Sequence, residues 1–117
     1  MADDPVTTNP DLYRVVFENE RVRVLEYLDA PGDRTERHSH PDSIMLTVSD
    51  FDRRLYDGER AVDVSKHAHE VNWLPAQSHA GENIGDRPSH AFFVELKEPP
   101  PSEASTEARD APLGPAT

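Results

Sequence analysis

Two histidines separated by one residue, His38 and His40, are the side chains in this sequence whose types and spacing most directly indicate chemistry. In a β-strand, residues i and i+2 project to the same face, so the two imidazoles would lie side by side, about 7 Å apart at the backbone. Such a pair can converge on one metal ion. The same pattern also fits two polar residues on a solvent-facing strand, so the pair alone leaves both interpretations open.

A third histidine follows about forty residues later in a distinctive setting. The stretch HEVNWLPAQSHAGENIGD contains Pro75, which predicts a turn, then His79 and, four residues further, Asn83. A second turn is predicted at Gly32, six residues before His38. These features strengthen the interpretation of His38 and His40 as metal ligands.

The remaining histidines are interpreted differently. His67 and His69 form a second pair of the same kind, but they follow a predicted turn and lack a third partner at a recognisable spacing, so we expect surface residues. His90 begins the last predicted strand and is interpreted as a strand-end or interface residue, with a fourth metal ligand as the alternative. Asp42 and Glu82 are alternative candidates for a carboxylate ligand. The alternation of side chains along a strand predicts that Glu82 points away from the histidines.

The elements that must position these side chains are strands. Short runs rich in Val, Leu, Ile, Phe and Tyr are separated by Gly, Pro, Asp and Asn, which is typical of an all-β sandwich or barrel. No run keeps the i, i+3, i+4 spacing of a helix for long. Asp57-Gly58 predicts a hairpin with a type I′ turn. The predicted strand runs are residues 12–17, 21–28, 43–49, 53–64, 70–74, 79–84 and 90–97.

These residues and spacings resemble the two motifs of the cupin superfamily, G-x5-H-x-H-x3,4-E-x6-G and G-x5-P-x-G-x2-H-x3-N, across residues 22–97. Small single-domain cupins of the cupin 2 type are especially similar. The resemblance implies a cupin-type double-stranded β-helix, also called a jelly-roll barrel, which is commonly dimeric and carries a metal near its middle. Gly32, His38 and His40 fit the first motif, and Pro75, His79 and Asn83 fit the second with one residue fewer between the proline and the histidine.

Two positions depart from the motifs. His69 stands where the second motif begins with glycine, and the glutamate of the first motif is replaced by Ile44 or Met45, depending on the spacing counted. Counting by twos from His38 and His40 puts Ile44 on their face. We therefore expect the apolar side chain of Ile44 to occupy the space of the missing carboxylate.

The resemblance then implies a metal site of three imidazoles, His38, His40 and His79, with one or more open coordination positions. The chain has no cysteine, so thiolate ligation is excluded. Imidazole suits zinc, iron, copper and nickel, whereas the manganese of a four-ligand site is put in doubt by the missing glutamate. The sequence predicts a divalent transition metal without choosing among these ions. The alternative is a cupin that has lost its metal and binds an organic ligand.

Two classes of function remain open. In one, the metal acts on a small organic molecule inside the barrel in an oxygenase, isomerase or lyase type of reaction. In the other, the barrel binds or senses a metal or small ligand without turnover. Arg23 and Arg54 either hold an anionic substrate or lie on solvated strand faces. We expect Trp73 to pack in the core, with ligand stacking as the alternative.

Composition limits the partners. The formal charge of -11 disfavours binding to nucleic acid and to anionic membranes. No run approaches the roughly 20 apolar residues that span a bilayer, so we expect a cytoplasmic protein. The resemblance implies a homodimer. Residues 1–20 are expected to form an N-terminal arm and first strand, and residues 21–97 the barrel. Residues 98–117 hold five of the eleven prolines and few apolar residues, which predicts a disordered tail.

Overall fold

The computed structural model describes residues 4–97, which form nine β-strands and one turn of helix. The prediction of an all-β fold is confirmed. Each predicted run overlaps at least one strand, and an additional short strand carries the histidine pair. The elements are α1 (Pro5–Thr8), β1 (Tyr13–Glu18), β2 (Val22–Asp29), β3 (His38–His40), β4 (Ser43–Thr47), β5 (Phe51–Asp57), β6 (Arg60–Lys66), β7 (Val71–Leu74), β8 (Gln77–Asn83) and β9 (Ser89–Leu96).

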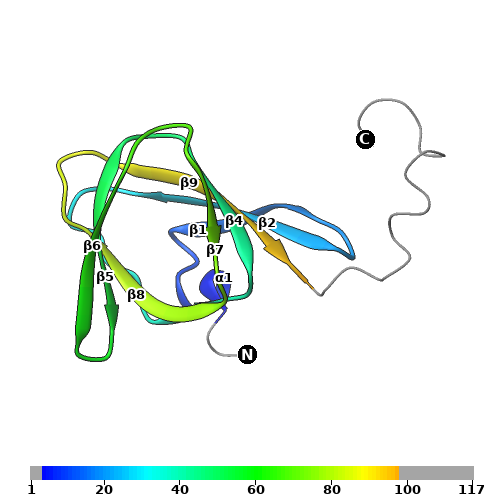
Figure 1. The fold of residues 1–117 in the computed structure, drawn as a ribbon. Helices are drawn as coiled ribbons and strands as arrows, with labels where there is room; N and C mark the ends of the chain where they lie inside the picture. The colour runs from blue at the N-terminus through cyan, green and yellow to red at the C-terminus, as the bar shows by residue number, and fades with distance from the viewer. Residues whose placement is uncertain (1–3, 98–117) are drawn as a thin grey trace.

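The strands form two antiparallel sheets that enclose the interior of a barrel (Figure 1). The larger sheet has the order β1-β2-β9-β4-β7, and the smaller has the order β3-β8-β5-β6. Strands distant in the sequence are neighbours in both sheets, β2 beside β9 and β3 beside β8. This topology brings the histidine pair next to the segment that contains the third histidine.

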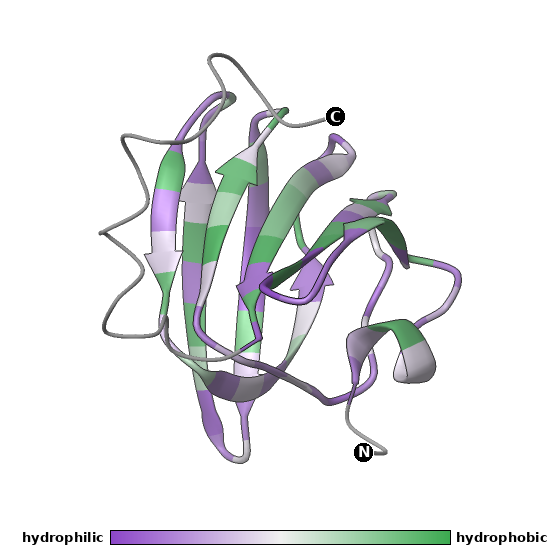
Figure 2. Ribbon diagram, turned by 90° about the vertical axis from the view of Figure 1, so that its right-hand side faces the viewer, coloured by the Kyte–Doolittle hydropathy of each residue, from purple (hydrophilic) through white to green (hydrophobic). Residues whose placement is uncertain are grey.

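Side chains alternate between the barrel interior and the outer surface. Along β9, burial alternates strictly, with Ser89, Ala91, Phe93 and Glu95 buried and the residues between them partly exposed. Hydrophobic and hydrophilic positions likewise follow each other along several strands in Figure 2. Because a carboxylate shares the inner face with apolar residues, the interior must provide polar partners as well as a hydrophobic core.

The hydrophobic core lies against the inner face of the larger sheet. Its buried members are Leu25 and Tyr27 on β2, Ala91 and Phe93 on β9, and Tyr13 on β1. Met45, Leu74, Val6 and Leu12 pack against this cluster while remaining partly exposed.

The prediction that Trp73 packs in the core is wrong. Its side chain is 56% exposed, on the same outer face of β7 as Val71, and it lies opposite Ile44 of β4. The alternation of the strand directs Leu74 and Asn72 inward instead. Hydrophobicity alone did not identify which face of β7 is buried, because the outer face of this sheet is also apolar.

The hairpin between β5 and β6 differs by one residue from the prediction. Asp57 pairs with Arg60, so the loop residues are Gly58 and Glu59. Gly58, at the first loop position, has a φ of +62°, whereas Glu59 lies outside the left-handed region. Glycine at the first position is the requirement of a type II′ turn rather than a type I′ turn.

The N-terminal segment is tied to the strand that carries the histidine pair. Asp4 caps α1 by accepting a hydrogen bond from Val6 N at 2.9 Å. Asn9 Oδ1 accepts from Glu36 N at 2.7 Å, and Asn9 Nδ2 donates to Glu36 O at 3.2 Å. These bonds fix the backbone just before β3.

The remaining expectations concern the chain as a whole. Within residues 4–97, no helix has the length and apolar character needed to cross a membrane. The proline-rich segment 98–117, predicted to be a disordered tail, lies outside the described residues.

Candidate metal centre

The structure brings the three predicted ligand residues together in the barrel interior. His38 and His40 lie on β3, and His79 lies on β8 directly opposite His38 in the antiparallel register. One nitrogen of each imidazole lies within 4.8 Å of those of the other two, and all three residues are buried. We call these residues the histidine triad.

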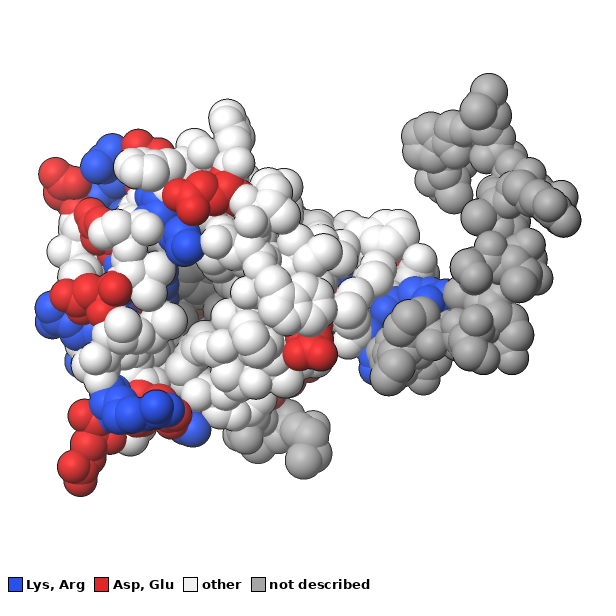
Figure 3. Space-filling model, in the orientation of Figure 1, with Lys and Arg blue, Asp and Glu red and all other residues white. Residues whose placement is uncertain are grey.

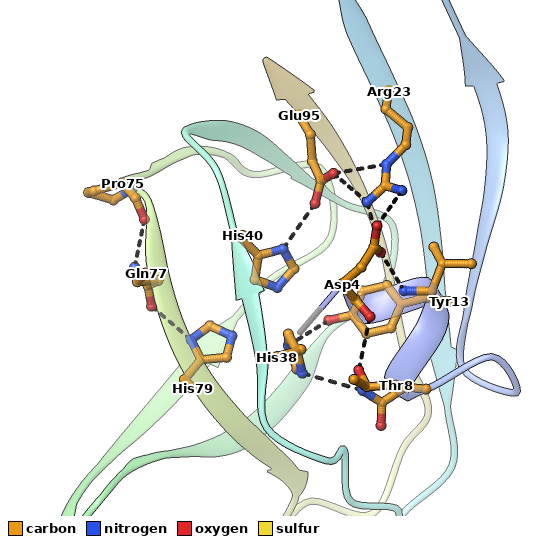
Figure 4. Close-up of polar contacts among 12 residues, drawn as sticks. Asp4, Thr8, Tyr13, Arg23, His38, His40, Pro75, Gln77, His79 and Glu95 are labelled. Atoms are coloured by element: carbon orange, nitrogen blue, oxygen red, sulfur yellow. Dashed lines mark hydrogen bonds and ion pairs between the residues drawn. The ribbon is translucent and has the colours of Figure 1, made fainter. Parts of the chain in front are cut away.

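Each imidazole of the triad has a hydrogen-bond acceptor at Nδ1, and Figure 4 shows those of His40 and His79. An acceptor at this position requires that Nδ1 carry the proton in the neutral ring, which leaves Nε2 with a free lone pair. Partners of this kind fix the tautomer and orientation of metal-binding histidines. The acceptors are Glu36 O for His38 at 2.7 Å, Glu95 Oε2 for His40 at 3.2 Å and Gln77 Oε1 for His79 at 2.8 Å.

One fully buried nitrogen of the triad lacks a partner among the described residues. His40 Nε2 is buried and makes no hydrogen bond with residues 4–97. Leaving a buried polar atom unpaired costs about 1–3 kcal/mol. A lone pair directed at two other imidazoles is a natural metal ligand, so the residues present fit a bound metal ion.

Electrostatics keep two of the imidazoles in their neutral form. Burial lowers the pKa of His38 from 6.5 to about 4, against the opposing effect of its hydrogen bond to Glu36 O. Burial also lowers the pKa of His79 to about 3, with further lowering by the neighbouring histidines and by Arg53. Both rings are therefore unprotonated near pH 7, as metal ligation requires.

Three charged side chains form a hydrogen-bonded network that begins at Nδ1 of His40. Glu95, which is 3% exposed, accepts from His40 with one oxygen, and its other oxygen accepts from Arg23 at 2.9 Å. Arg23 also donates to both carboxylate oxygens of Asp4, at 2.9 and 3.0 Å. Arg23 therefore belongs to a partly buried network of ion pairs and does not lie on a solvated strand face. Sequence reasoning missed this role of Glu95, although Glu95 lies in the cupin-like segment VELK.

Tyr13 places a hydroxyl group next to the triad. Its Oη lies 3.4 Å from His38 Nε2, and its ring packs edge-on against the His38 ring. Burial raises the pKa of the phenol well above its ordinary value, so Tyr13 stays protonated and can act as a hydrogen-bond donor. Nothing in the local sequence distinguishes Tyr13 from any other aromatic residue in a strand.

A cavity of about 260 Å³ adjoins His38 and His79. No Asp or Glu of the described residues lines it, and its wall is mainly aromatic and aliphatic. The face drawn in Figure 3 is hollowed near its centre, between charged side chains over β5 and β6 and a largely uncharged surface over β7 and β4. The apolar lining includes Tyr13, Tyr27, Phe51, Leu55, Val64, Leu74 and Phe93.

The prediction that Ile44 occupies the position of the missing glutamate is wrong. Ile44 is 37% exposed on the outer face of β4, paired with Val94 and Trp73. The chain leaves the smaller sheet after β3 and enters the larger sheet at β4, so counting by twos across residues 41–42 fails. Met45 projects inward instead and lines the cavity. The site still lacks a carboxylate from this strand.

Other candidate residues lie away from the triad. His67 and His69 are exposed, as predicted, and His69 adopts a positive φ of 68° in a turn. His90 faces outward on β9 and pairs with Glu26 at 2.7 Å, so it is not a fourth ligand. Glu82 points away from the triad, as predicted.

Three polar residues that were candidates for binding metal or substrate interact with groups outside the triad instead. Glu82 accepts from Tyr56 Oη at 2.7 Å. Asp42 accepts from the backbone of Ala76 at 2.9 Å. Arg54 pairs with Asp63 on the exposed face of the hairpin, in agreement with the solvated alternative.

Comparison with known proteins places this arrangement among solved folds. No protein-family model matches the chain, and no curated protein matches it. A cupin domain from Bordetella pertussis Tohama I is similar over 74% of this chain and 93% of its own, with 25% identity and a TM-score of 0.70. The Cupin_2 domain of an XRE family transcriptional regulator from Enterobacter cloacae covers 76% of this chain and 97% of its own, with 14% identity and a TM-score of 0.56.

A third similar structure is a predicted oxalate decarboxylase from Thermotoga maritima, with 17% identity and a TM-score of 0.51 over 72% of this chain and 78% of its own. The fold and the triad define a small antiparallel jelly-roll barrel whose interior could hold a metal ion. The chain belongs to the cupin superfamily, and its fold is the double-stranded β-helix predicted from the sequence.

Proposed function

We propose that the protein binds one divalent transition metal through Nε2 of His38, His40 and His79, and that it acts on a small organic molecule in the adjacent cavity. The observation that carries this proposal is the set of acceptors at Nδ1. Each acceptor frees the nitrogen on the opposite side of its ring, and one of these nitrogens is buried without a partner. A purely structural cluster would be expected to satisfy that atom.

The donor set limits the choice of metal. Three neutral imidazoles without thiolate or carboxylate suit zinc, iron, copper or nickel better than manganese, which prefers oxygen ligands. Three protein ligands leave at least one coordination position open, as in catalytic rather than structural zinc sites. A metal bound there would supply Lewis acidity or, if it is redox-active, activation of oxygen.

The protein's own side chains restrict the reaction class. Isomerase and lyase reactions generally need a base that removes a proton from carbon, yet no carboxylate of the described residues lines the cavity. Lys66 lines it, but its ammonium group is held by Asn72 Oδ1 at 2.9 Å. Tyr13 can donate a hydrogen bond to a molecule bound at the triad. These features favour an oxygenase among the three reaction types.

A non-catalytic cupin that binds or senses a metal or small ligand is the second candidate. The same shortage of acid and base groups in the cavity wall favours it. The similar structures cannot separate the two, because one is described as a domain of a transcriptional regulator and another as a predicted decarboxylase. The fold serves both kinds of function.

Metal content of purified protein tests the proposal. Tag-free protein prepared without chelator should contain close to one metal ion per chain by inductively coupled plasma mass spectrometry. The His38→Ala/His40→Ala variant should lose it, whereas the exposed pair variant His67→Ala/His69→Ala should retain it. Equal metal content in all three proteins, or none after addition of iron, zinc, copper and nickel, would overturn the proposal. Oxygen uptake with candidate substrates then separates oxygenase from binding protein.

A further inference from the structure

We propose that the cavity is a binding site for a small monocarboxylate with an apolar body, whose carboxylate is held by Arg53. This inference rests on the proposed function, because it assigns a substrate class to the cavity beside the histidine triad. It adds an anchoring residue on β5 that takes no part in holding the metal.

Arg53 is held rigidly in the barrel interior. Its side chain is 12% exposed, and Nη1 contacts Asp29 Oδ2 at 2.5 Å and Ser89 Oγ at 3.4 Å. The guanidinium carbon lies 4.9 Å from the centre of the Tyr27 ring. A charged group fixed in this way has already lost the rotamer freedom that binding would otherwise cost.

The backbone of β8 leaves room for this guanidinium. A Cβ atom at Gly81 would lie 2.4 Å from Arg53 Nη2, a distance that real side chains do not tolerate. Gly81 sits between His79 and Asn83 on the inward face of the strand. The glycine therefore lets Arg53 approach the strand that carries the third histidine.

Arg53 retains donors that the described protein does not use. Its hydrogen bonds with residues 4–97 all come from Nη1, so Nε and Nη2 donate to no acceptor among them. Arg53 lines the same cavity as His38 and His79, and none of the carboxylates within residues 4–97 lines that cavity. A guanidinium edge with two free N–H groups matches the two oxygens of a carboxylate.

The charges around the triad and the cavity also favour a ligand with a single negative charge. Asp29 neutralises Arg53, and the ammonium group of Lys66 lies 3.7 Å from Glu70 Oε1. The network of Asp4, Arg23 and Glu95 carries one net negative charge. A divalent ion on three neutral imidazoles would leave one positive charge uncompensated. A monocarboxylate would cancel it, whereas a phosphate dianion would overshoot and would find only one guanidinium to bind it.

The cavity wall determines the rest of the molecule. Apart from Arg53, the two histidines, Lys66 and Asn72, the wall is apolar or aromatic. The volume of about 260 Å³ accommodates a compact aromatic or branched aliphatic acid. Benzoate is therefore a suitable probe, and benzamide is its neutral counterpart of nearly the same shape.

Calorimetric titration of the zinc-loaded full chain with both probes tests the proposal. Benzoate should bind at least about tenfold more tightly than benzamide, as expected for charge-assisted hydrogen bonds. The Arg53→Gln/Asp29→Asn variant removes both charges of the pair together, so no buried charge is left unpaired, and it should abolish this preference. Arg54→Gln, which alters the exposed neighbour on the same strand, should preserve it.

Gly81→Ala gives a second test that leaves the charges in place. The added Cβ displaces Nη2, so the preference for benzoate should fall while the fold, checked by circular dichroism, persists. Equal affinity for both probes in the wild type, or an unchanged preference in both cavity variants, would overturn the inference.

The same titration on metal-free protein separates this inference from the proposed function. If the protein takes up no metal, the metal site is contradicted. If the metal-free protein still prefers benzoate, and the Arg53→Gln/Asp29→Asn variant loses this preference, the carboxylate site is supported. Stoichiometric metal together with no effect of Arg53→Gln/Asp29→Asn would support the metal site and contradict the carboxylate site.

Discussion

Acidification of the metal-free protein tests the electrostatic state of the histidine triad. The pKa of His38 is lowered to about 4 and that of His79 to about 3, mainly by burial, whereas both are about 6.5 in the unfolded chain. Below pH 6.5, His38 and His79 therefore bind protons in the unfolded chain but not in the folded protein. The free energy of unfolding must fall as the pH drops from 6.5 towards 4, and it must be unaffected by these groups above about pH 7.5.

The magnitude follows from the unfolded pKa. At pH 5.5, one unit below 6.5, each buried neutral histidine contributes a loss of about 1.4 kcal/mol, so the two together cost roughly 3 kcal/mol relative to pH 7.5. This loss does not depend on the folded pKa values as long as both stay well below 5.5. It is a large part of the stability of a domain of this size, which is typically about 5–15 kcal/mol.

Urea denaturation at pH 7.5 and pH 5.5, followed by circular dichroism on protein dialysed against chelator, measures this difference. The His67→Ala/His69→Ala variant should show the same difference, because the two removed residues are exposed. His79→Gln, which removes one titrating ring, should show about half of it. Equal stability at the two pH values in the wild-type protein would refute the neutral state of buried His38 and His79.

Three further predictions concern the surroundings of the site and the outer surface. Glu95→Gln should lower zinc affinity by about 10- to 100-fold in a competition titration, as is typical when a carboxylate partner of a ligating histidine is lost, and unchanged affinity would contradict its supporting role. Met45→Glu should tighten manganese binding, whereas Ile44→Glu on the outer face should not, and the reverse order would show that the inward residue of β4 is misassigned. We expect a homodimer that forms through the apolar outer face of the larger sheet. Sedimentation equilibrium should give twice the chain mass for the wild type and a shift towards monomer for Trp73→Lys. A monomeric wild type would contradict this expectation.

The strands could be predicted from the sequence because their signals are local. Alternating Val, Leu, Ile, Phe and Tyr between turn residues identified them, and these patterns are set by residues close together in the chain. The three histidines were identified through the resemblance to the two cupin motifs. The topology of the barrel followed from the resemblance in the motifs and could not be derived from the strand runs themselves.

The supporting residues could not be predicted in the same way. Glu95 meets His40 across 55 positions, and Tyr13 meets His38 across 25, so both contacts depend on how the two sheets pack against each other. Arg53 resembles its neighbour Arg54 in sequence, and only the alternation of β5 sends one inward and the other to solvent.

The two wrong assignments of a side chain to a strand face have a common physical origin. Ile44 was assigned to the inner face by counting through residues 41–42, where the chain crosses from one sheet to the other. Trp73 was assigned to the core because it is large and apolar, although its strand presents an apolar outer face. In both cases the residue type was correctly described, but the face of the strand was not fixed by local sequence.

Anomalous diffraction from crystals of the metal-loaded protein tests the central claim most directly. The account predicts a single peak at the absorption edge of the bound metal, about 2.0–2.1 Å from Nε2 of each of His38, His40 and His79. A peak beside the exposed pair His67 and His69, or no peak in protein soaked with zinc, iron, copper and nickel in turn, would contradict it.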